Sequence, residues 1–429
     1  MRKFLTAGCF SLLLAIPAAA EVNTYGPHPD LPQPEGGWFP TVNVAPASAW
    51  PKDGAPRPAK GFKVNAFARD LHHPRWLYVL PNGDVLVAET NTPSEPIKGI
   101  ADWVTRMVMA RAGAGMKSPN QIVLLRDTNG DGIADKRTVF IKGLYSPFGM
   151  VLVGNTLYVA DTDAVLMFPY RDGETSITAE PKKLVDLPAG NIDYHWTKNI
   201  VASADGTKLF VSVGSDSNFG DNGMENEKGR AAIWEIDRTT GKHRIYASGM
   251  RNPVGMSFQP ETGALWASVN ERDELGDNLP PDYMTEVKDG GFYGWPYSYW
   301  GKHVDDRVKP QRPDLVANAL TPDYALGAHT ASLGLTFYTG TLFGPHYRGG
   351  AFVGQHGSWN RSTHAGYKVI FVAFKNGKPD GTPEDMLTGF LNSDGEAQGR
   401  PVCVTVAKDG ALLVADDVGN AVWRLMPGK

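Results

Sequence analysis

The hydrophobic positions of the chain recur in a strand-turn-strand pattern from Gly61 onward. An apolar strand leads into a turn that contains glycine, and a second apolar strand follows and ends in small or acidic residues. Six such second strands occur, at residues 85–89, 157–161, 209–213, 265–269, 351–355 and 412–416. They lie roughly 50 to 90 residues apart, and no regular helical segments separate them. This pattern predicts an all-β, six-bladed β-propeller.

Three segments lie outside the six repeats. Residues 61–67 precede the first repeat and are expected to supply the outer strand of the last blade, which closes the ring. Residues 97–111 carry apolar residues at helical spacing and predict a short helical insertion in blade one. That helix either packs on the side of the propeller or serves as a lid or docking surface. Residues 21–60 predict a Pro-rich N-terminal arm, so the propeller is expected to span residues 61–429.

The first twenty residues predict an export signal. Arg2 and Lys3 precede an apolar stretch, and three alanines at residues 18–20 are typical of a cleavage site. Residues 1–20 are therefore expected to be a cleavable signal peptide, with a periplasmic or secreted mature chain. Without Cys9, the remaining Cys403 has no partner for an intrachain disulfide. It lies in an alternating strand and is expected to be a core residue.

The charge and hydropathy of the chain exclude two classes of partner. It has 42 Lys and Arg against 46 Asp and Glu, with a formal net charge of −4. A mildly acidic chain is a poor match for nucleic acid. After the signal, no apolar run is long enough for a membrane span, and none is expected. The motifs of zincins, thiol redox enzymes, P-loop NTPases and α/β-hydrolases are also absent from the sequence.

Candidate chemistry lies in the segments that precede the six inner strands. In a propeller, these segments converge on one mouth of the central channel, and here they carry Arg75, Arg251, Arg400, His73, His195 and His329. Arginine binds carboxylates with two parallel hydrogen bonds and stacks on conjugated rings. The mouth therefore favours a planar, polyanionic ligand. Any one of these arginines could instead pair with a nearby aspartate.

His195 is the candidate general base of this mouth. An imidazole of near-neutral pKa that a carboxylate orients can remove a hydroxyl proton. Asp193 and Asp216 are the nearest candidates for that carboxylate in the sequence. A structural role is the alternative for an isolated histidine.

Two loops carry oxygen donors that suit calcium. In residues 270–278, Gly276 allows backbone carbonyl groups to turn inward, and a solvated acidic loop is the alternative. A second loop copies the first nine positions of an EF-hand, with candidate ligands Asp127, Asn129, Asp131 and Asp135. Its twelfth position is Thr138, where an EF-hand needs a glutamate. This second loop either binds calcium or forms a tight Asx turn, and the turn is the favoured interpretation.

Six segments in order carry a resemblance to a known family: residues 195–199, 249–255, 270–277, 291–296, 356–361 and 399–402. The chain resembles the soluble PQQ-dependent sugar dehydrogenases, the glucose and sorbosone dehydrogenase family, and within it most the sorbosone dehydrogenase-type members. PQQ is pyrroloquinoline quinone. The resemblance implies a six-bladed propeller with noncovalent PQQ at the channel mouth. It also implies calcium as a second cofactor.

The resemblance assigns a role to each candidate residue. His195 would take the proton from a sugar hydroxyl as hydride passes to the quinone. Because Ser215 stands where the glucose-oxidising members have an aspartate, Asp216 is the candidate partner of His195. The candidates for holding the cofactor are Arg251, Asn252 and Arg400, with Arg75 from the mouth and Arg361 in place of a family lysine. The backbone carbonyls of Gly276 and Asp277 would hold a calcium ion that polarises the quinone.

The expected activity is therefore oxidation of an aldose or aldehyde sugar, such as glucose or sorbosone, with cytochrome c or a quinone as electron acceptor. One alternative is a calcium-dependent lactonase on a similar propeller, which needs carboxylate ligands at the axis. Another is a noncatalytic propeller that binds glycans or proteins.

Overall fold

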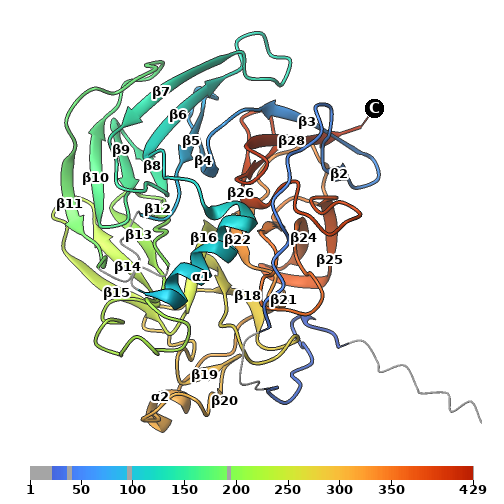
Figure 1. Cartoon of the computed structure of the whole chain (residues 1–429). Helices are drawn as coiled ribbons and strands as arrows, with labels where there is room; N and C mark the ends of the chain where they lie inside the picture. Colours follow the sequence, from blue (N-terminus) through green and yellow to red (C-terminus); the bar gives the residue numbers. More distant parts are fainter. Residues whose placement is uncertain (1–21, 36–40, 94–98, 191–194, 429) are drawn as a thin grey trace, which may run out of the picture.

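The computed structural model describes residues 22–35, 41–93, 99–190 and 195–428. The predicted signal peptide, residues 1–20, lies outside the described residues, as does Asp193. The strands of the described residues form six main sheets arranged in a ring (Figure 1). The predicted six-bladed β-propeller is confirmed.

Blades one to three follow one another along the chain, each as a four-stranded antiparallel sheet that runs from the inner to the outer strand. Blade one comprises β4 (Pro74–Val79), β5 (Val85–Glu89), β6 (Gln121–Arg126) and β7 (Lys136–Lys142). Blade two comprises β8 (Met150–Val153), β9 (Thr156–Ala160), β10 (Ala164–Pro169) and β11 (Lys182–Asp186). Blade three comprises β12 (Ile200–Ala202), β13 (Lys208–Val213), β14 (Ala232–Asp237) and β15 (His243–Ser248).

Blades four to six have the same plan, with one insertion. Blade four comprises β16 (Asn252–Phe258), β17 (Leu265–Asn270), β18 (Pro281–Glu286) and β21 (Tyr324–Ala328). Between β18 and β21 the chain forms the hairpin of β19 (Ser298–Tyr299) and β20 (His303–Val304) and the short helix α2 (Pro313–Val316). Blade five comprises β22 (Ser332–Phe337), β23 (Ala351–Gln355), β24 (Lys368–Lys375) and β25 (Lys378–Thr388). Blade six comprises β26 (Pro401–Val406), β27 (Leu412–Asp416), β28 (Ala421–Pro427) and β3 (Phe62–Ala68).

The N-terminal part of the chain closes the ring, as the repeat pattern predicts. Strand β3 pairs antiparallel with β28 and is the outer strand of the last blade. The preceding arm adds short edge strands to two blades, since β1 (Tyr25–Gly26) pairs with β21 and β2 (Arg57–Pro58) pairs with β25. Between β1 and β2 the arm bonds to loops of the propeller: Ala47 N–H donates to the carbonyl of Arg111, and Ser48 N–H donates to that of Ala397.

The predicted helix of blade one is present between β5 and β6 as α1 (Ile100–Met109), and a single π-helical turn, Ala110–Ala114, continues it. The β5–β6 connection leaves the blade at the end where β4 begins, because Pro74 is paired with Glu89. Helix α1 therefore belongs to the mouth side, and in Figure 1 it crosses the middle of the ring. In the part of the chain that the structure describes, no helix is long and apolar enough to cross a membrane.

The second strand of each blade lies between neighbouring strands and blades, which explains its continuous apolar sequence. Every residue of β5, β23 and β27 is buried. Cys403, in β26, is 2% exposed, and burial raises the pKa of its thiol to about 12. The prediction that Cys403 is a core residue is therefore confirmed.

Acidic side chains at the ends of the second strands fix the segments that lead into the inner strands. A carboxylate oxygen of Glu89 accepts the His72 N–H, one of Asp161 accepts the Tyr145 N–H, and one of Asp416 accepts the Arg400 N–H. Each bond joins the end of a second strand to the loop before the inner strand of the same blade. The repeated acidic endings thus position the mouth residues.

Asp161 gives a prediction for stability against pH. Burial raises the pKa of its carboxyl to about 8, well above the value of about 4 in an unfolded chain. Because the folded protein binds this proton more tightly, its contribution to stability is lost as the pH rises from about 4 through 8. Asparagine is neutral and retains an acceptor for the Tyr145 N–H. Asp161→Asn should therefore melt at a higher temperature than the wild type at pH 8, with a much smaller difference at pH 5.

Thermal melts followed by circular dichroism measure this difference. Asp172→Asn is a matched control, because Asp172 is an exposed acid of the same blade. Equal melting temperatures for Asp161→Asn and wild type at pH 8 would contradict the prediction.

Candidate active site at the channel mouth

The predicted mouth residues do come together, because the inner strands pack against one another around the axis. Strands β16, β22, β26 and β4 follow one another in contact. Arg251 and Arg400 directly precede β16 and β26, and His73 precedes β4. Their side chains are buried. The loops that follow the second strands end at this same side and complete the mouth.

His195 is held as a neutral proton acceptor. Its Nδ1 lies 2.9 Å from the carbonyl oxygen of Ser215 and 3.0 Å from the Ser215 hydroxyl. Because a carbonyl oxygen only accepts, Nδ1 carries the hydrogen and the lone pair is on Nε2. Burial, together with the nearby charge of Arg251, holds the pKa of His195 well below its usual range. The imidazole is therefore uncharged at neutral pH.

Ser215 contacts the His195 ring in the structure, and the pairing of His195 with Asp216 that the sequence suggests stays a prediction. The Asp216 carboxylate lies 3.9 Å from Arg230, and its backbone N–H donates to Glu227. The Ser215 hydroxyl is itself held, since it donates to the Ser217 carbonyl at 2.6 Å. Sequence reasoning searched for a carboxylate and missed a serine that presents its carbonyl and hydroxyl oxygens together.

Gly214 allows this arrangement. A Cβ atom at this position would lie 2.5 Å from both Asn252 Oδ1 and His195 Cβ. Such an approach is far inside van der Waals contact, so a residue with a side chain would displace one of the two neighbours. Glycine thus lets the candidate base and the candidate cofactor amide pack against the end of β13. The sequence signal was the glycine directly after the second strand of blade three.

Arg251 donates to protein acceptors from each of its nitrogens. Nη1 is 2.6 Å from the Glu271 carbonyl, and Nε is 3.2 Å from the Asn218 carbonyl. Nη2 is 3.0 Å from Asn218 Oδ1 and 3.3 Å from Asp273. The side chain is 1% exposed. Arg251 therefore ties together the loops after β13 and β17, and the adjacent Asn252 has a buried Oδ1 with no hydrogen-bond partner in the described residues.

The other three predicted arginines each retain a buried, unpaired donor. Within the described residues, Nε of Arg75, Arg361 and Arg400 has no hydrogen-bond partner. Such a donor, buried without an acceptor, costs about 1–3 kcal/mol. Arg400 makes only long bonds through its terminal nitrogens, at 3.2–3.5 Å, and its guanidinium lies 4.8 Å from the ring centroid of Tyr367. These donors fit a ligand that supplies carboxylate or carbonyl oxygens.

A buried carboxylate, Asp417, gathers basic residues from two other blades, and sequence reasoning missed it. It accepts a hydrogen bond from Arg75 and lies 2.9 Å from His356 Nε2 and 3.8 Å from His73 Nε2. Despite burial, these neighbours hold the pKa of Asp417 well below its usual range. Burial lowers the pKa of His356 to about 4 although Asp417 opposes this shift. Asp417 therefore fixes Arg75 at the mouth and orients a neutral imidazole beside it.

The Gly276 carbonyl, one of the two backbone carbonyls predicted to hold calcium in blade four, has other partners. The Gly276 carbonyl oxygen is 2.8 Å from His329 Nε2 and 3.4 Å from the Leu279 backbone nitrogen. The Asp277 carboxylate accepts from the backbone N–H and hydroxyl of Ser362. The residues as they stand do not fit a calcium ion at Gly276.

The EF-hand-like loop between β6 and β7 is a series of Asx turns. Asp127 accepts the N–H groups of Gly130 and Gly132, and Asp131 accepts that of Ile133. Asn129 and Asp135 likewise accept backbone N–H groups of the loop. Across the described ranges, no group of three or more His, Cys, Asp or Glu side chains is arranged to hold a metal. The geometry fits the turn interpretation of this loop.

Comparison with known proteins places the chain in a family. Residues 58–422 match the family described as "Domain of unknown function (DUF7133)". The chain belongs to the DUF7133 family. An uncharacterised protein of Borreliella burgdorferi is 32% identical to this DUF7133 chain over 296 residues, which cover 66% of the chain and 76% of that protein.

A relative with an assigned activity is the pyrroloquinoline quinone-dependent pyranose dehydrogenase of Coprinopsis cinerea. It is 24% identical to the DUF7133 chain over 368 residues, which are 74% of the chain and 46% of that enzyme. The match thus spans about half of the enzyme's length. The solved holo form of its PQQ domain has a TM-score of 0.71 at 21% identity, covering 89% of the chain and 99% of that domain. At this identity, the structural likeness shows the fold.

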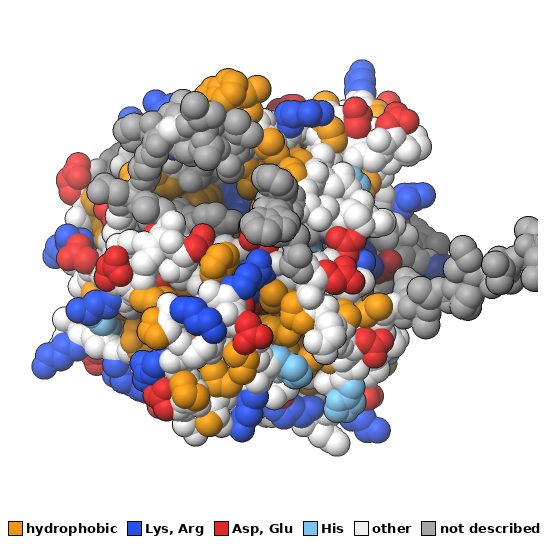
Figure 2. All heavy atoms as spheres, turned by 60° about the horizontal axis from the view of Figure 1, so that its bottom comes forward, with side chains coloured by type: hydrophobic (Ala, Val, Ile, Leu, Met, Phe, Trp, Pro, Cys, Tyr) orange, Lys and Arg blue, Asp and Glu red, His pale blue; other side chains and the backbone are white. Residues whose placement is uncertain are grey.

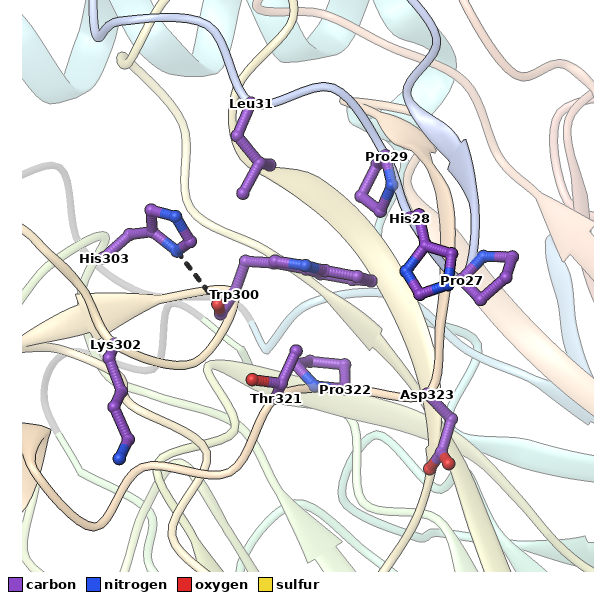
Figure 3. Close-up of a pocket in the computed structure, with 10 residues that line it drawn as sticks. All are labelled: Pro27, His28, Pro29, Leu31, Trp300, Lys302, His303, Thr321, Pro322 and Asp323. Carbon is purple, nitrogen blue, oxygen red and sulfur yellow. Dashed lines mark hydrogen bonds between the residues drawn. The ribbon is translucent and has the colours of Figure 1, made fainter.

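A cavity of about 630 Å³ lies away from the mouth of the DUF7133 chain, between the N-terminal arm and the insertion of blade four. Figure 3 shows the Trp300 ring between Leu31 of the arm and Pro322. The His303 ring bonds to the Trp300 carbonyl. No predicted site residue lines this cavity. The face drawn in Figure 2 carries acidic and basic side chains interspersed with hydrophobic ones.

Proposed function

We propose that the channel mouth binds PQQ and that the chain uses it to oxidise a hydroxyl or aldehyde group of a small sugar, such as an aldose or sorbosone. The observation that carries the proposal is the set of buried, unpaired Nε groups of Arg75, Arg361 and Arg400 around one mouth. A planar ligand with several carboxylates supplies the acceptors that they lack. The Coprinopsis relative and its PQQ domain support this choice of ligand. When bound, PQQ supplies the two-electron acceptor.

In the proposed reaction, residues of the chain bind and orient the ligand, and His195 removes a proton from the substrate. Arg400 and Arg75 hold carboxylates of the ligand, and Tyr367 and Asp417 keep their guanidinium groups in place. His195 accepts the substrate's hydroxyl proton at Nε2, because its Nδ1–H is committed to Ser215.

Three further residues complete the proposed site. Arg361 is the third carboxylate-binding arginine, and Asn252 offers its amide to the ligand. Arg251 holds the loops that surround them. The arm covers this side of the site, since the Ala45 carbonyl accepts from Arg400, and so helps to exclude water.

Electrons are proposed to leave through cytochrome c or a quinone, in the periplasm or outside the cell, as the predicted signal peptide suggests. The lactonase alternative needs a cluster of carboxylates at the axis. The mouth instead presents guanidinium and imidazole groups, among which Asp417 is already engaged. The mouth chemistry therefore favours an anionic cofactor.

Titration with PQQ tests the proposal. The purified chain should bind PQQ saturably, with a change in PQQ absorbance and quenching of the fluorescence of nearby tryptophans such as Trp196. The loaded protein should then reduce an artificial dye when it is given sorbosone or one of a panel of aldoses. Arg244→Gln is a matched control, because Arg244 lies on the outer strand β15 and pairs with Glu235 and Asp289. Absence of PQQ binding would overturn the proposal and leave the noncatalytic propeller.

A further inference from the structure

The Gly276 carbonyl has no remaining capacity for a metal ion. A carbonyl oxygen has two lone pairs. The His329 Nε2–H occupies one at 2.8 Å, and the backbone N–H of Leu279 approaches the other at 3.4 Å. A calcium ion could bind this oxygen only if the His329 side chain moved away. The oxygen that the resemblance assigns to a metal is therefore already the acceptor of a side-chain donor.

His329 is fixed in this position from several sides. It comes from the segment before β22, and its side chain is 2% exposed. Its Nδ1 lies 3.4 Å from Asp273, and that same carboxylate lies 3.3 Å from Arg251. The neighbouring Thr330 is held by its hydroxyl, which donates to Asp282 at 3.0 Å. The imidazole is thus part of a buried network and would not leave without breaking it.

Donors from the segment between β23 and β24 also contact the β17–β18 loop, where calcium would need oxygen ligands. Arg361 donates to Asn278 Oδ1 at 3.1 Å and to the Ala328 carbonyl at 3.3 Å. Its guanidinium therefore lies against Asn278, in the same loop as Gly276. The Asp277 carboxylate accepts from the backbone N–H and the hydroxyl of Ser362. A divalent cation near Gly276 would therefore meet the positive charge of Arg361. The Gly276 carbonyl and the Asp277 carboxylate already accept hydrogen bonds from other groups.

We propose, on the basis of the PQQ site proposed above, that this mouth holds its cofactor without a calcium ion, because the Nε2–H of His329 occupies the carbonyl where the related sugar dehydrogenases would hold the metal. Calcium would then be dispensable for cofactor binding in this chain. The group that meets the Gly276 carbonyl of the β17–β18 loop is then a side chain of the protein itself, His329.

Calorimetric titration of the cofactor-free chain with calcium chloride tests the occupancy of Gly276 independently of PQQ. The EF-hand-like loop is a possible second calcium site, so the double variant Asp127→Asn, Asp131→Asn is titrated in parallel. The expected result is that the double variant binds no calcium with a Kd below about 1 mM. Calcium binding that persists in the double variant and is lost in Asp273→Asn would overturn the proposal.

Variants of His329 test whether this residue is what prevents calcium from binding at the Gly276 carbonyl. His329→Leu removes the donor and frees the Gly276 carbonyl beside the Asp273 carboxylate, and it should gain calcium affinity of about tenfold or more. His329→Gln can still donate to the carbonyl and should remain as insensitive to calcium as the wild type. Equal, negligible binding by both variants would overturn the assignment to His329.

PQQ titration, once in EGTA and once in calcium, then tests whether cofactor binding depends on calcium. It links the occupancy of the Gly276 carbonyl by His329 to the proposed function. The two Kd values should agree within about twofold. A requirement for calcium would overturn the inference while leaving the proposed PQQ site intact. Absence of PQQ binding in both buffers would overturn the proposed function, and the calcium titration of the cofactor-free chain would still decide whether Gly276 is occupied.

Discussion

Replacement of His195 by glutamine is expected to reduce sugar-dependent turnover by about 10²- to 10⁴-fold while leaving PQQ affinity nearly unchanged. The imidazole is neutral, and its Nδ1–H is committed to Ser215, so Nε2 is the acceptor for the substrate proton. Glutamine has a similar reach and can donate to the same carbonyl, but it has no basic nitrogen. Dye reduction under saturating sugar measures turnover, and PQQ titration of the same preparation measures affinity.

The pH profile gives a second reading of His195. Burial and the charge of Arg251 hold its pKa well below its usual range, and a general base acts only when it is unprotonated. Turnover of the wild type should therefore stay level as the pH falls from 8 through the ordinary histidine pKa of about 6.5. A decline centred near pH 6.5 would contradict the environment described for this imidazole.

Variants of two residues near His195 distinguish a role in catalysis from a role in structural stability. Ser215→Ala removes the hydroxyl but keeps the backbone carbonyl that fixes the tautomer, so its turnover should stay within about tenfold of the wild type. Asp216→Asn removes the charge that faces Arg230, and its effect should appear as lower thermal stability. Loss of turnover in Asp216→Asn that equals the loss in His195→Gln, at unchanged stability, would instead identify Asp216 as the catalytic partner of His195.

The blade architecture could be predicted from the sequence because its cause is local. A second strand buried by its neighbours needs a continuous apolar run, and the turn before it needs residues such as Asn82 and Gly83. Six copies of that signal fixed the blade count. The closure of the ring, in which β3 pairs with β28, could be predicted from the one extra strand that precedes the first copy. The helix of blade one followed from its own spacing in the same way.

The site could be predicted only in part, because its decisive contacts join residues far apart in sequence. That His195 and Arg251 reach one mouth follows from topology, and the sequence supports it. That His329 bonds to Gly276, or that Asp417 gathers Arg75 and His356, depends on how side chains from different blades meet. The periodic pattern of hydrophobic residues carries no information about such contacts between blades. Composition could indicate a basic mouth, but it could not show which donors are already paired.

The pairing of the mouth arginines leads to opposite predictions for two of them. Arg251 has short bonds to the Glu271 carbonyl and Asn218 and lies near Asp273, all inside the protein. Arg251→Met removes the buried guanidinium that pairs with Asp273 and donates to the Glu271 carbonyl and to Asn218, and it should lower the free energy of unfolding by about 3–5 kcal/mol. Urea denaturation of the cofactor-free variant measures this loss.

Arg400→Met should behave in the reverse way. Its terminal nitrogens make only long bonds, its Nε has no partner among the described residues, and its guanidinium lies over Tyr367. Little stability is therefore expected to be lost when the guanidinium is removed, because methionine keeps the packing on the ring. A charged hydrogen bond to the ligand is worth about 1.5–3 kcal/mol, so PQQ affinity should fall by about 10- to 100-fold.

Urea denaturation and PQQ titration of both variants form one crossed experiment. The opposite result would be a larger loss of stability in Arg400→Met than in Arg251→Met, with PQQ affinity retained in Arg400→Met. It would show that the assignment of a structural role to Arg251 and a ligand-binding role to Arg400 is wrong.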